Sequence, residues 1–391
     1  MNIGVFFGSR SPEHEVSIIT GEFIISELKK LGYGIVPIYL DKNGYWFVSE
    51  KMGSLKTFTT GKIEDRKNDK KIYLDLEASN GKLVFKNKGL GGKKYTVDVA
   101  FPAFHGQNGE DGTMQGLFEM FNMPYVGCDV ASSAITIDKV LTKLLFQRFD
   151  IPTTEFLYFD KNEWNAKRVE FLEIAERDLG WPIFVKPARL GSSIGIAKAN
   201  NTKELEIAIE VALKYDDKIL IEKAVGNLME ITCAVIGGEN PRASLIQESI
   251  FENDLFTYED KYLNDGGTQL GNADQKIVIP ARLNEELTEE IQSLSIEIFK
   301  KFGCSGMVRI DFLFDKENQK YYANEINTLP GTLYHHLWKA SGLETGNLLK
   351  ELIAIAEERH KKKSKFISSM ESDILRFANS VKLRIGDEKN I

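Results

Sequence analysis

One stretch of the sequence, VRIDFLFDKENQKYYANEINTLPGT, carries the groups best suited to catalysis. Side chains alternate across a β-strand, so Arg309 and Asp311 share one face, opposite an apolar one. The polar run 315–320 is typical of a turn, and Glu325 and Asn327 project together after it. Antiparallel pairing would bring these four side chains together. The oxygens of Asp311, Glu325 and Asn327, incomplete by themselves, suit Mg²⁺ that also coordinates nucleotide phosphates, with Arg309 beside them. We therefore expect a metal-dependent active site in preference to a solvated strand face with ordinary ion pairs.

A small-residue loop follows a strand-like segment that ends in lysine, in FVKPARLGSSIGI. Such a loop lets backbone N–H groups approach phosphate oxygens, and Lys186 would add a point charge. The loop runs from Gly191 through Ser192 to Gly195, and it is neither a Walker loop nor a GxGxxG turn. By itself this pattern fits a phosphate site and a plain hairpin equally well.

A further nucleotide contact is suggested by ILIEKAV, an apolar strand that ends in the adjacent charges Glu222 and Lys223. The backbone N–H and C=O groups of such a strand would pair with an adenine edge, and the two charges would flank the base and the sugar. Taken alone, a surface strand end with a salt bridge is the simpler interpretation.

Polar residues also follow two strands predicted in the amino-terminal part. Glu15 lies in the turn after the first strand, and His105 follows a later one. Both therefore fall on the edge of an α/β sheet where ligands bind. Glu15 would suit an ammonium group or a proton transfer. The alternative is that it interacts with the dipole of the helix that begins nearby.

The segment YEDKYLNDGGTQ is polar, contains glycine and lies between apolar segments. It is typical of a mobile loop that closes over a reactive intermediate and excludes water. Lys261 and Tyr262 are its candidates for contacts to phosphate and for closure. A solvated connector explains the composition equally well.

The order of the predicted elements indicates an α/β protein, because strand, loop, helix and strand alternate from the start. We predict an N-terminal α/β substrate-binding domain over residues 1–127, a central unit over 128–226 and a third, catalytic unit over 227–363. The lysine-rich residues 50–98 are expected to form hairpins of the first domain. Residues 364–391 have apolar side chains at helical spacing and are predicted to form an appended amphipathic helix.

The composition of the 391 residues is that of an ordinary soluble globular protein, with 42% hydrophobic and 27% charged residues. No apolar run approaches the roughly 18 residues of a membrane helix. The three cysteines follow no metal or disulfide pattern, which indicates a reducing cytoplasm. A formal net charge of −7 gives no global electrostatic reason to bind nucleic acid.

Taken together, residues 1–361 resemble the D-alanine–D-alanine ligase family of the ATP-grasp enzymes. The resemblance rests on segments in family order: SPEHEVS, HGQNGEDGTMQG, PYVGCDVASSAITIDK, VKPARLGSSIGIAKA, IEKAV, YEDKYLNDGGTQ, RIDF and NEINTLPG. It implies an ATP-grasp fold, with a parallel α/β domain followed by two α+β ATP-grasp subdomains. It also implies a ligation in which ATP phosphorylates a donor carboxylate and an acceptor amine attacks the acyl phosphate. Such an enzyme would make a peptidoglycan precursor as a cytoplasmic homodimer that binds small molecules and neither nucleic acid nor membrane.

The resemblance further implies roles for residues at matching motif positions. ATP phosphates would be bound by Lys139 and Lys186, and the adenine and ribose pocket would include Glu222, Lys223, Val225 and Glu230. Two Mg²⁺ or Mn²⁺ ions would be held by Asp311, Glu325 and Asn327. The tetrahedral oxyanion would be stabilised by Arg309 and the Gly331 N–H. In the substrate site, Glu15 would meet the first substrate's ammonium, with His105 nearby. In the loop, Lys261 would reach the transferring phosphate. Glu15, Ser192 and Tyr262 would form the hydrogen-bonded link that closes the loop.

The chain departs from the family after Gly331. Family members have about four further residues there, followed by a serine and an apolar residue that grip the second substrate's carboxylate. Here the alignment places Thr332 and Leu333 in those two positions, with His335 in place of a proline. An imidazole there would attract a carboxylate, or it would lie on a helix surface and contact no substrate. The acceptor is therefore open, and the alternatives are a ligase with a different acceptor and a nucleotide-binding regulatory protein without ligase activity.

Overall fold

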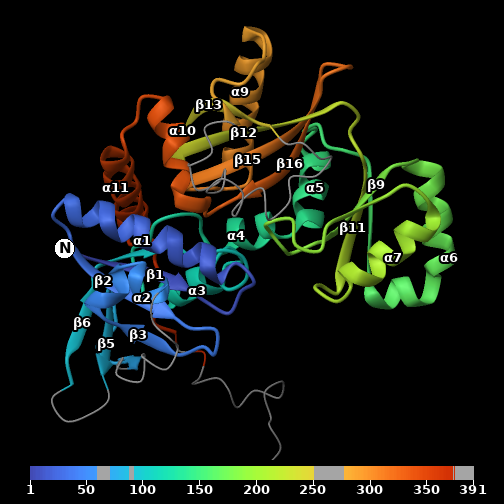
Figure 1. Cartoon of the computed structure of the whole chain (residues 1–391). Helices are drawn as coiled ribbons and strands as arrows, with labels where there is room; N and C mark the ends of the chain where they lie inside the picture. Colours follow the sequence, from blue (N-terminus) through green and yellow to red (C-terminus); the bar gives the residue numbers. More distant parts are fainter. Residues whose placement is uncertain (60–70, 88–91, 251–276, 373, 375–391) are drawn as a thin grey trace, which may run out of the picture.

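The chain begins with alternating strands and a helix, as the sequence predicts. The computed structural model describes residues 1–59, 71–87, 92–250, 277–372 and 374 (Figure 1). The first sheet has the strand order β3-β2-β1-β7, in which β1 pairs in parallel with β2 and with β7. Its elements are β1 (Asn2–Gly8), α1 (His14–Lys30), β2 (Gly34–Leu40), β3 (Trp46–Val48) and β7 (Val99–Pro102). Parallel pairing places the carboxyl ends of β1 and β7 at the same edge of the sheet.

The expected hairpins of the first domain are present in the described part of 50–98. A small antiparallel sheet has the order β4-β5-β6. Its apolar side chains share a core with Phe6 and Ile38 of the first sheet. The elements between β3 and β7 are η1 (Glu50–Gly53), α2 (Lys56–Thr59), β4 (Ile72–Leu74), β5 (Leu83–Asn87) and β6 (Lys94–Val97).

The middle of the chain forms a four-stranded antiparallel sheet with the order β10-β9-β11-β8. Helices α6 and α7 cover it, as the green region of Figure 1 shows. The elements from residue 113 to residue 223 are α3 (Thr113–Met120), α4 (Val130–Ile137), α5 (Lys139–Arg148), β8 (Phe156–Asp160), α6 (Lys161–Asp178), β9 (Ile183–Pro187), β10 (Ala197–Ala199), α7 (Thr202–Ala212) and β11 (Lys218–Lys223).

A five-stranded antiparallel sheet follows, with the order β14-β13-β12-β15-β16. Helix α9 packs on one face of this sheet, and Phe146 of α5 belongs to the same core. The elements from residue 228 onward are β12 (Leu228–Gly237), β13 (Arg242–Ser249), β14 (Ile277–Val278), α9 (Glu285–Lys301), β15 (Gly306–Asp315), β16 (Lys320–Asn327), η5 (Gly331–Tyr334), α10 (His335–Ala340) and α11 (Thr345–Lys363).

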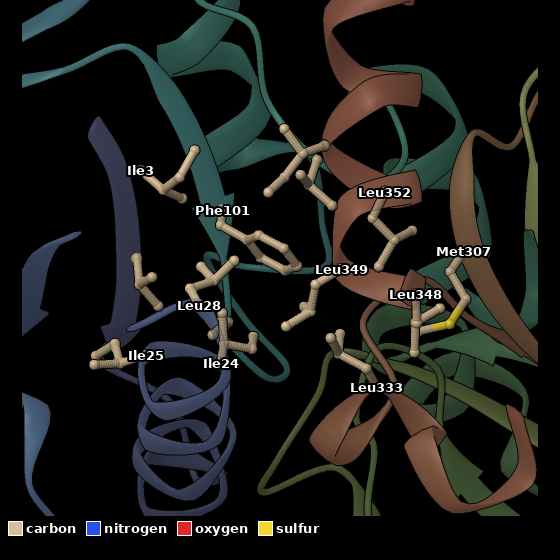
Figure 2. Close-up of a cluster of buried hydrophobic side chains, with 14 of the residues drawn as sticks. Ile3, Ile24, Ile25, Leu28, Phe101, Met307, Leu333, Leu348, Leu349 and Leu352 are labelled. Atoms are coloured by element: carbon tan, nitrogen blue, oxygen red, sulfur yellow. The ribbon is translucent and has the colours of Figure 1, made fainter. Parts of the chain in front are cut away.

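A shared hydrophobic core joins the first sheet to the five-stranded sheet. Figure 2 shows Phe101 of β7 and Leu28 of α1 facing Leu349 and Leu352 of α11. Met307 of β15 belongs to the same cluster. This packing brings the carboxyl edge of the first sheet close to β15 and β16, where the sequence predicts the catalytic groups.

The predicted helix at the carboxyl end is wrong for the part of it that the structure describes. Helix α11 ends at Lys363, and residues 364–372 form a turn and then a stretch without helix. Phe366, Ile367 and Met370 are exposed there, so their helical spacing buries no apolar face. Within the described ranges, no helix is both long and apolar enough to cross a membrane.

Candidate active site

The predicted strand pair is present, and its register brings the four polar residues together. On β15 and β16, Arg309 pairs with Asn327, and Asp311 pairs with Glu325. The alternate residues of β15 are buried in the core beneath α9. Period-two alternation therefore separates a core face from a polar face, as the sequence indicates.

Asp311 lies at the centre of this polar face. It accepts hydrogen bonds from the Thr232 hydroxyl at 2.8 Å, from Arg309 Nη2 at 2.7 Å and from Asn327 Nδ2 at 3.0 Å. Burial raises the pKa of Asp311, and the nearby Glu325 carboxylate raises it further, whereas Arg309 opposes both effects. A divalent cation between the two carboxylates would relieve this repulsion, so the donor set fits Mg²⁺ or Mn²⁺.

The two carboxylates and one amide do not form a complete cage. In the described ranges, no group of three or more His, Cys, Asp or Glu side chains could hold a metal ion. Mg²⁺ prefers six oxygens and is often bound by one or two carboxylates together with substrate phosphates. The arrangement therefore fits a metal that arrives with a nucleotide.

Two lysines face the carboxylates from the other sheet and from α5. Lys139 Nζ lies 3.6 Å from Glu325 Oε2, and it donates a hydrogen bond to the Leu190 carbonyl. Lys186 of β9 contacts Glu222 and donates to Asn324 Oδ1 at 3.2 Å. Both ammonium groups are buried, so they are placed to meet phosphate oxygens.

Glu222 is a buried carboxylate that contacts both Lys143 and Lys186. Its Oε2 lies 2.8 Å from Lys143 Nζ and accepts a hydrogen bond from the Thr154 hydroxyl at 2.9 Å. Burial acts to raise the pKa of Glu222, but Lys143 and Lys186 outweigh it and lower the pKa to about 2. Lys143 was missed by sequence reasoning. Its position one helical turn after Lys139 was the available signal, because residues i and i+4 share a helix face.

A cavity between the four-stranded and five-stranded sheets contains the residues predicted to bind nucleotide. Its lining includes the residues predicted to bind ATP phosphates, adenine and ribose, together with Ser192, Arg309, Asp311 and Glu325. The predicted nucleotide contacts among these are Lys139, Lys186, Glu222, Lys223, Val225 and Glu230. Lys223 is exposed and its Nζ lies 3.1 Å from Glu155 Oε2, so it marks the open side of the cavity.

A second cavity adjoins the first and opens toward the first sheet. Glu13, His105 and Glu110 line it opposite Asn327 and Gly331. Lys139, Ser192, Arg309 and Glu325 border both cavities. A carboxylate in the second cavity would therefore lie beside phosphate groups in the first.

The structure places Glu15 apart from the other predicted site residues. Glu15 lines neither of these two cavities; its side chain is 61% exposed and lies 2.6 Å from Lys42 Nζ. Glu13 is buried in the second cavity and accepts the hydrogen bond of Ser192 that was expected for Glu15. The reason is local: Glu13 precedes α1 and points inward, whereas Glu15 lies in the first helical turn and points to solvent.

Burial controls the charge of the second cavity. Burial and the neighbouring Glu13 carboxylate raise the pKa of Glu110 to about 8, although Gly106 N–H donates to it at 2.8 Å. Burial and the positive charge of Arg309 lower the pKa of His105 to about 3. His105 is therefore a neutral imidazole near pH 7, and its Nε2 lies 2.8 Å from the Thr20 hydroxyl.

The acceptor positions predicted after Gly331 are not in either cavity. Thr332 is buried and donates its backbone N–H to the Thr20 hydroxyl at 3.2 Å. Leu333 packs in the core beside Leu348 and Leu349, as Figure 2 shows. The shortened segment turns away from the cavity, and the next residue, Tyr334, lines the first cavity instead.

His335 and His336 also lie outside the two cavities. The ring centroid of His335 is 4.5 Å from that of Phe23, and His336 Nε2 lies 2.7 Å from Gln247 Oε1. Burial lowers the pKa of both histidines, to about 4 for His336. Neither imidazole is therefore placed or charged to attract an acceptor carboxylate near neutral pH. The expected loop residues Lys261 and Tyr262 lie outside the described residues.

The mixed architecture and this two-cavity site define an ATP-grasp fold. Residues 2–128 match the family described as D-ala D-ala ligase N-terminus, and residues 145–354 match D-ala D-ala ligase C-terminus. The chain belongs to the D-alanine–D-alanine ligase family.

Individual relatives agree over nearly the whole length. The chain is 43% identical over 377 residues to the D-alanine–D-alanine ligase of Thermosipho melanesiensis, covering 96% of this chain and 98% of that protein. The enzyme of the same name from Caldicellulosiruptor bescii is 40% identical over 380 residues, which cover 95% of this chain and 99% of that protein.

Two solved structures are similar in fold. The D-alanine–D-alanine ligase of Coxiella burnetii has a TM-score of 0.76 and 31% identity, covering 93% of this chain and 97% of that chain. The VanG D-Ala:D-Ser ligase of Enterococcus faecalis has a TM-score of 0.76 and 30% identity, covering 91% of this chain and 99% of that chain.

Proposed function

We propose that this protein uses ATP to join D-alanine to a second D-alanine through an acyl-phosphate intermediate, and so makes a peptidoglycan precursor. One observation carries the proposal. Glu325, which pairs with Asp311 across the two strands, borders both the cavity that contains Lys139 and Lys186 and the second cavity, which contains Glu13 and His105. A nucleotide and a small amino acid would meet at that pair. The family relationship supports ATP-dependent ligation as the reaction.

The first cavity would hold the nucleotide. Lys139 and Lys186 would bind its phosphates, and the lining around Glu222 and Val225 would receive the adenine and the ribose. Asp311, Glu325 and Asn327 would hold two Mg²⁺ or Mn²⁺ ions, which would neutralise phosphate charge during transfer. The Asn327 amide now donates to Asp311, so it would rotate to present its oxygen.

The second cavity would hold the donor. Glu13 would pair with the donor ammonium, and the neutral His105 would lie beside it. The donor carboxylate would then point toward the bound phosphates and attack the γ-phosphorus. Arg309 and the Gly331 N–H would stabilise the oxyanion that forms when the acceptor amine attacks the acyl phosphate. Ser192, which hydrogen-bonds Glu13 and borders both cavities, would link the donor site to the nucleotide site.

The acceptor would bind beside the segment that follows Gly331. Thr332 and Leu333 are buried away from the cavities, so the usual wall for the acceptor carboxylate is altered. A structural neighbour with the same fold is named as a D-Ala:D-Ser ligase. We therefore propose D-alanine as the acceptor, in line with the names of the relatives, and keep D-serine as the alternative to test.

Phosphate release across a panel of acceptors tests this proposal. The purified protein is incubated with ATP, Mg²⁺ and D-alanine, with D-serine or D-lactate added in separate reactions, and the products are identified by mass. We expect D-alanyl-D-alanine as the main product near neutral pH. A different dipeptide or a D-lactate ester as the main product would reassign the acceptor. Nucleotide binding without substrate-dependent ADP release would favour a regulatory protein.

A further inference from the structure

Tyr334 covers Arg309 in the first cavity, at a position that the sequence motifs do not single out. The guanidinium carbon of Arg309 lies over the Tyr334 ring, 5.0 Å from its centroid. Tyr334 is 3% exposed and Arg309 is 5% exposed, so bulk water screens this contact only weakly. A desolvated cation over an aromatic face is attracted by the quadrupole of the ring.

The ring and Asp311 restrain Arg309 in different ways. Arg309 Nε lies 2.9 Å from Asp311 Oδ1, and its Nη2 lies 2.7 Å from Asp311 Oδ2. These two bonds hold one edge of the guanidinium, whereas the ring of Tyr334 covers it from above. Asp311 is also a proposed metal ligand, so its negative charge would be shared once a metal ion is bound. The aromatic contact does not depend on that charge.

The surroundings of Tyr334 hold its ring in place. Its hydroxyl is hydrogen-bonded by the Gln247 side chain of β13. Gln247 in turn accepts a hydrogen bond from His336 Nε2 at 2.7 Å, and the His336 ring lies 4.9 Å from that of Tyr334. This chain of contacts ties the position of the ring to the five-stranded sheet that carries Arg309.

The backbone before Tyr334 is strained in a way that delivers this ring to the cavity. Thr332, Leu333 and Tyr334 have φ values of 44°, 57° and 46°. Each left-handed residue other than glycine costs roughly 1–2 kcal/mol, so such a run persists only where its surroundings hold it. The contacts of Thr332 with Thr20 and of Leu333 with the core supply that support.

We propose that Tyr334 is a positioning residue that holds the Arg309 guanidinium, by its aromatic face, in the orientation that stabilises the oxyanion. The proposal rests on the ligation proposed above. It replaces the idea that the residues after Gly331 act mainly by gripping the acceptor. Because the ring acts on Arg309, its removal affects turnover more than substrate affinity.

The test compares three replacements at position 334 in the full-length protein. Tyr334→Phe keeps the ring, Tyr334→Leu removes it, and tetrafluorophenylalanine keeps the shape while it weakens the negative charge of the ring face. We expect kcat within about twofold of the parent for Tyr334→Phe. We expect a roughly tenfold fall, about 1.4 kcal/mol, for Tyr334→Leu, and a fall of several-fold for the fluorinated ring. The KM values for ATP and for D-alanine should change less than twofold.

The controls separate positioning from structural damage. Tyr321→Leu removes a tyrosine from the same sheet whose hydroxyl contacts Glu290, outside both cavities, and it should leave kcat unchanged. Equal kcat for the phenylalanine and fluorinated variants would overturn the proposal even if Tyr334→Leu fails to fold. A parent protein that shows no ligation would refute the proposed function instead, so the two failures are distinguishable.

Discussion

Replacing Glu13 by glutamine should damage donor binding, whereas the same change at Glu15 should not. Glu13 is buried in the second cavity and accepts the hydroxyl hydrogen of Ser192. Glutamine keeps the size of the side chain and its ability to accept that hydrogen bond, but it removes the negative charge. A hydrogen bond to a charged group contributes about 1.5–3 kcal/mol. The loss corresponds to a roughly 10- to 150-fold fall in kcat/KM at low D-alanine.

Glu15→Gln is the matched control because it makes the identical chemical change two residues away. The Glu15 side chain is 61% exposed and pairs with the exposed Lys42 at 2.6 Å, and such surface pairs contribute about 0–1 kcal/mol. We expect its kcat/KM to stay within about twofold of the parent.

Initial rates of ADP release at low and saturating D-alanine measure both effects, with the KM for ATP as an internal check that the nucleotide cavity is intact. A larger loss for Glu15→Gln than for Glu13→Gln would refute the assignment of Glu13 to the donor site. Equal activity of both variants and the parent would show that neither carboxylate meets the donor ammonium.

Three further predictions concern the metal site, pH-dependent stability and the buried lysine. Glu325→Gln should lower kcat by roughly 100-fold or more without a change in thermal unfolding, because it removes one of the two paired carboxylates proposed to hold the metal ions. Near-normal turnover would exclude Glu325 as a metal ligand. Burial raises the pKa of Glu22 to about 7, above its ordinary 4.5, and its Oε1 is buried without a hydrogen-bond partner in the described part of the chain. This group therefore does not affect the free energy of unfolding below pH 4.5, and it lowers that free energy progressively as the pH rises to 7. Glu22→Gln should raise the free energy of unfolding, measured in urea, by about 1–2 kcal/mol at pH 8 and not at all at pH 4. An equal increase at both pH values would contradict this origin. Lys143→Met should lower the free energy of unfolding by about 2–4 kcal/mol, because the side chains of Lys143 and Glu222 are each 99% buried and Glu222 would lose a cationic partner. A loss below about 0.5 kcal/mol would show that Lys186 alone balances the negative charge of Glu222.

The strand pair could be predicted from the sequence because its information is local. Arg309 and Asp311, like Glu325 and Asn327, lie two residues apart, and a short polar turn joins the strands, so their shared face follows from the period of two; the register shift after Asp311 does not. The choice between Glu13 and Glu15 is not local. It depends on Ser192, which lies 179 residues from Glu13 in the chain and donates its hydroxyl hydrogen to that residue.

The segment after Gly331 shows a second limit of sequence reasoning. Motif matching across a deletion assumes that the backbone keeps the direction it has in relatives. Here three consecutive residues adopt left-handed backbone angles, so Thr332 and Leu333 turn into the core and Tyr334 reaches the cavity. Non-glycine residues rarely adopt this conformation, and nothing in the residue types of the segment predicts it.

Transfer of a carboxylate oxygen from the donor to phosphate tests the central claim most directly. In the proposed ligation a donor carboxylate oxygen attacks the γ-phosphorus of ATP, and that oxygen leaves with inorganic phosphate when the acceptor amine displaces it. D-alanine labelled with ¹⁸O in its carboxylate is incubated with ATP, Mg²⁺ and the protein, and the phosphate is analysed by mass spectrometry. We predict one labelled oxygen in each phosphate released, with one D-alanyl-D-alanine and one ADP formed per turnover. Unlabelled phosphate would contradict the acyl-phosphate mechanism, because water would then be the group that attacks ATP.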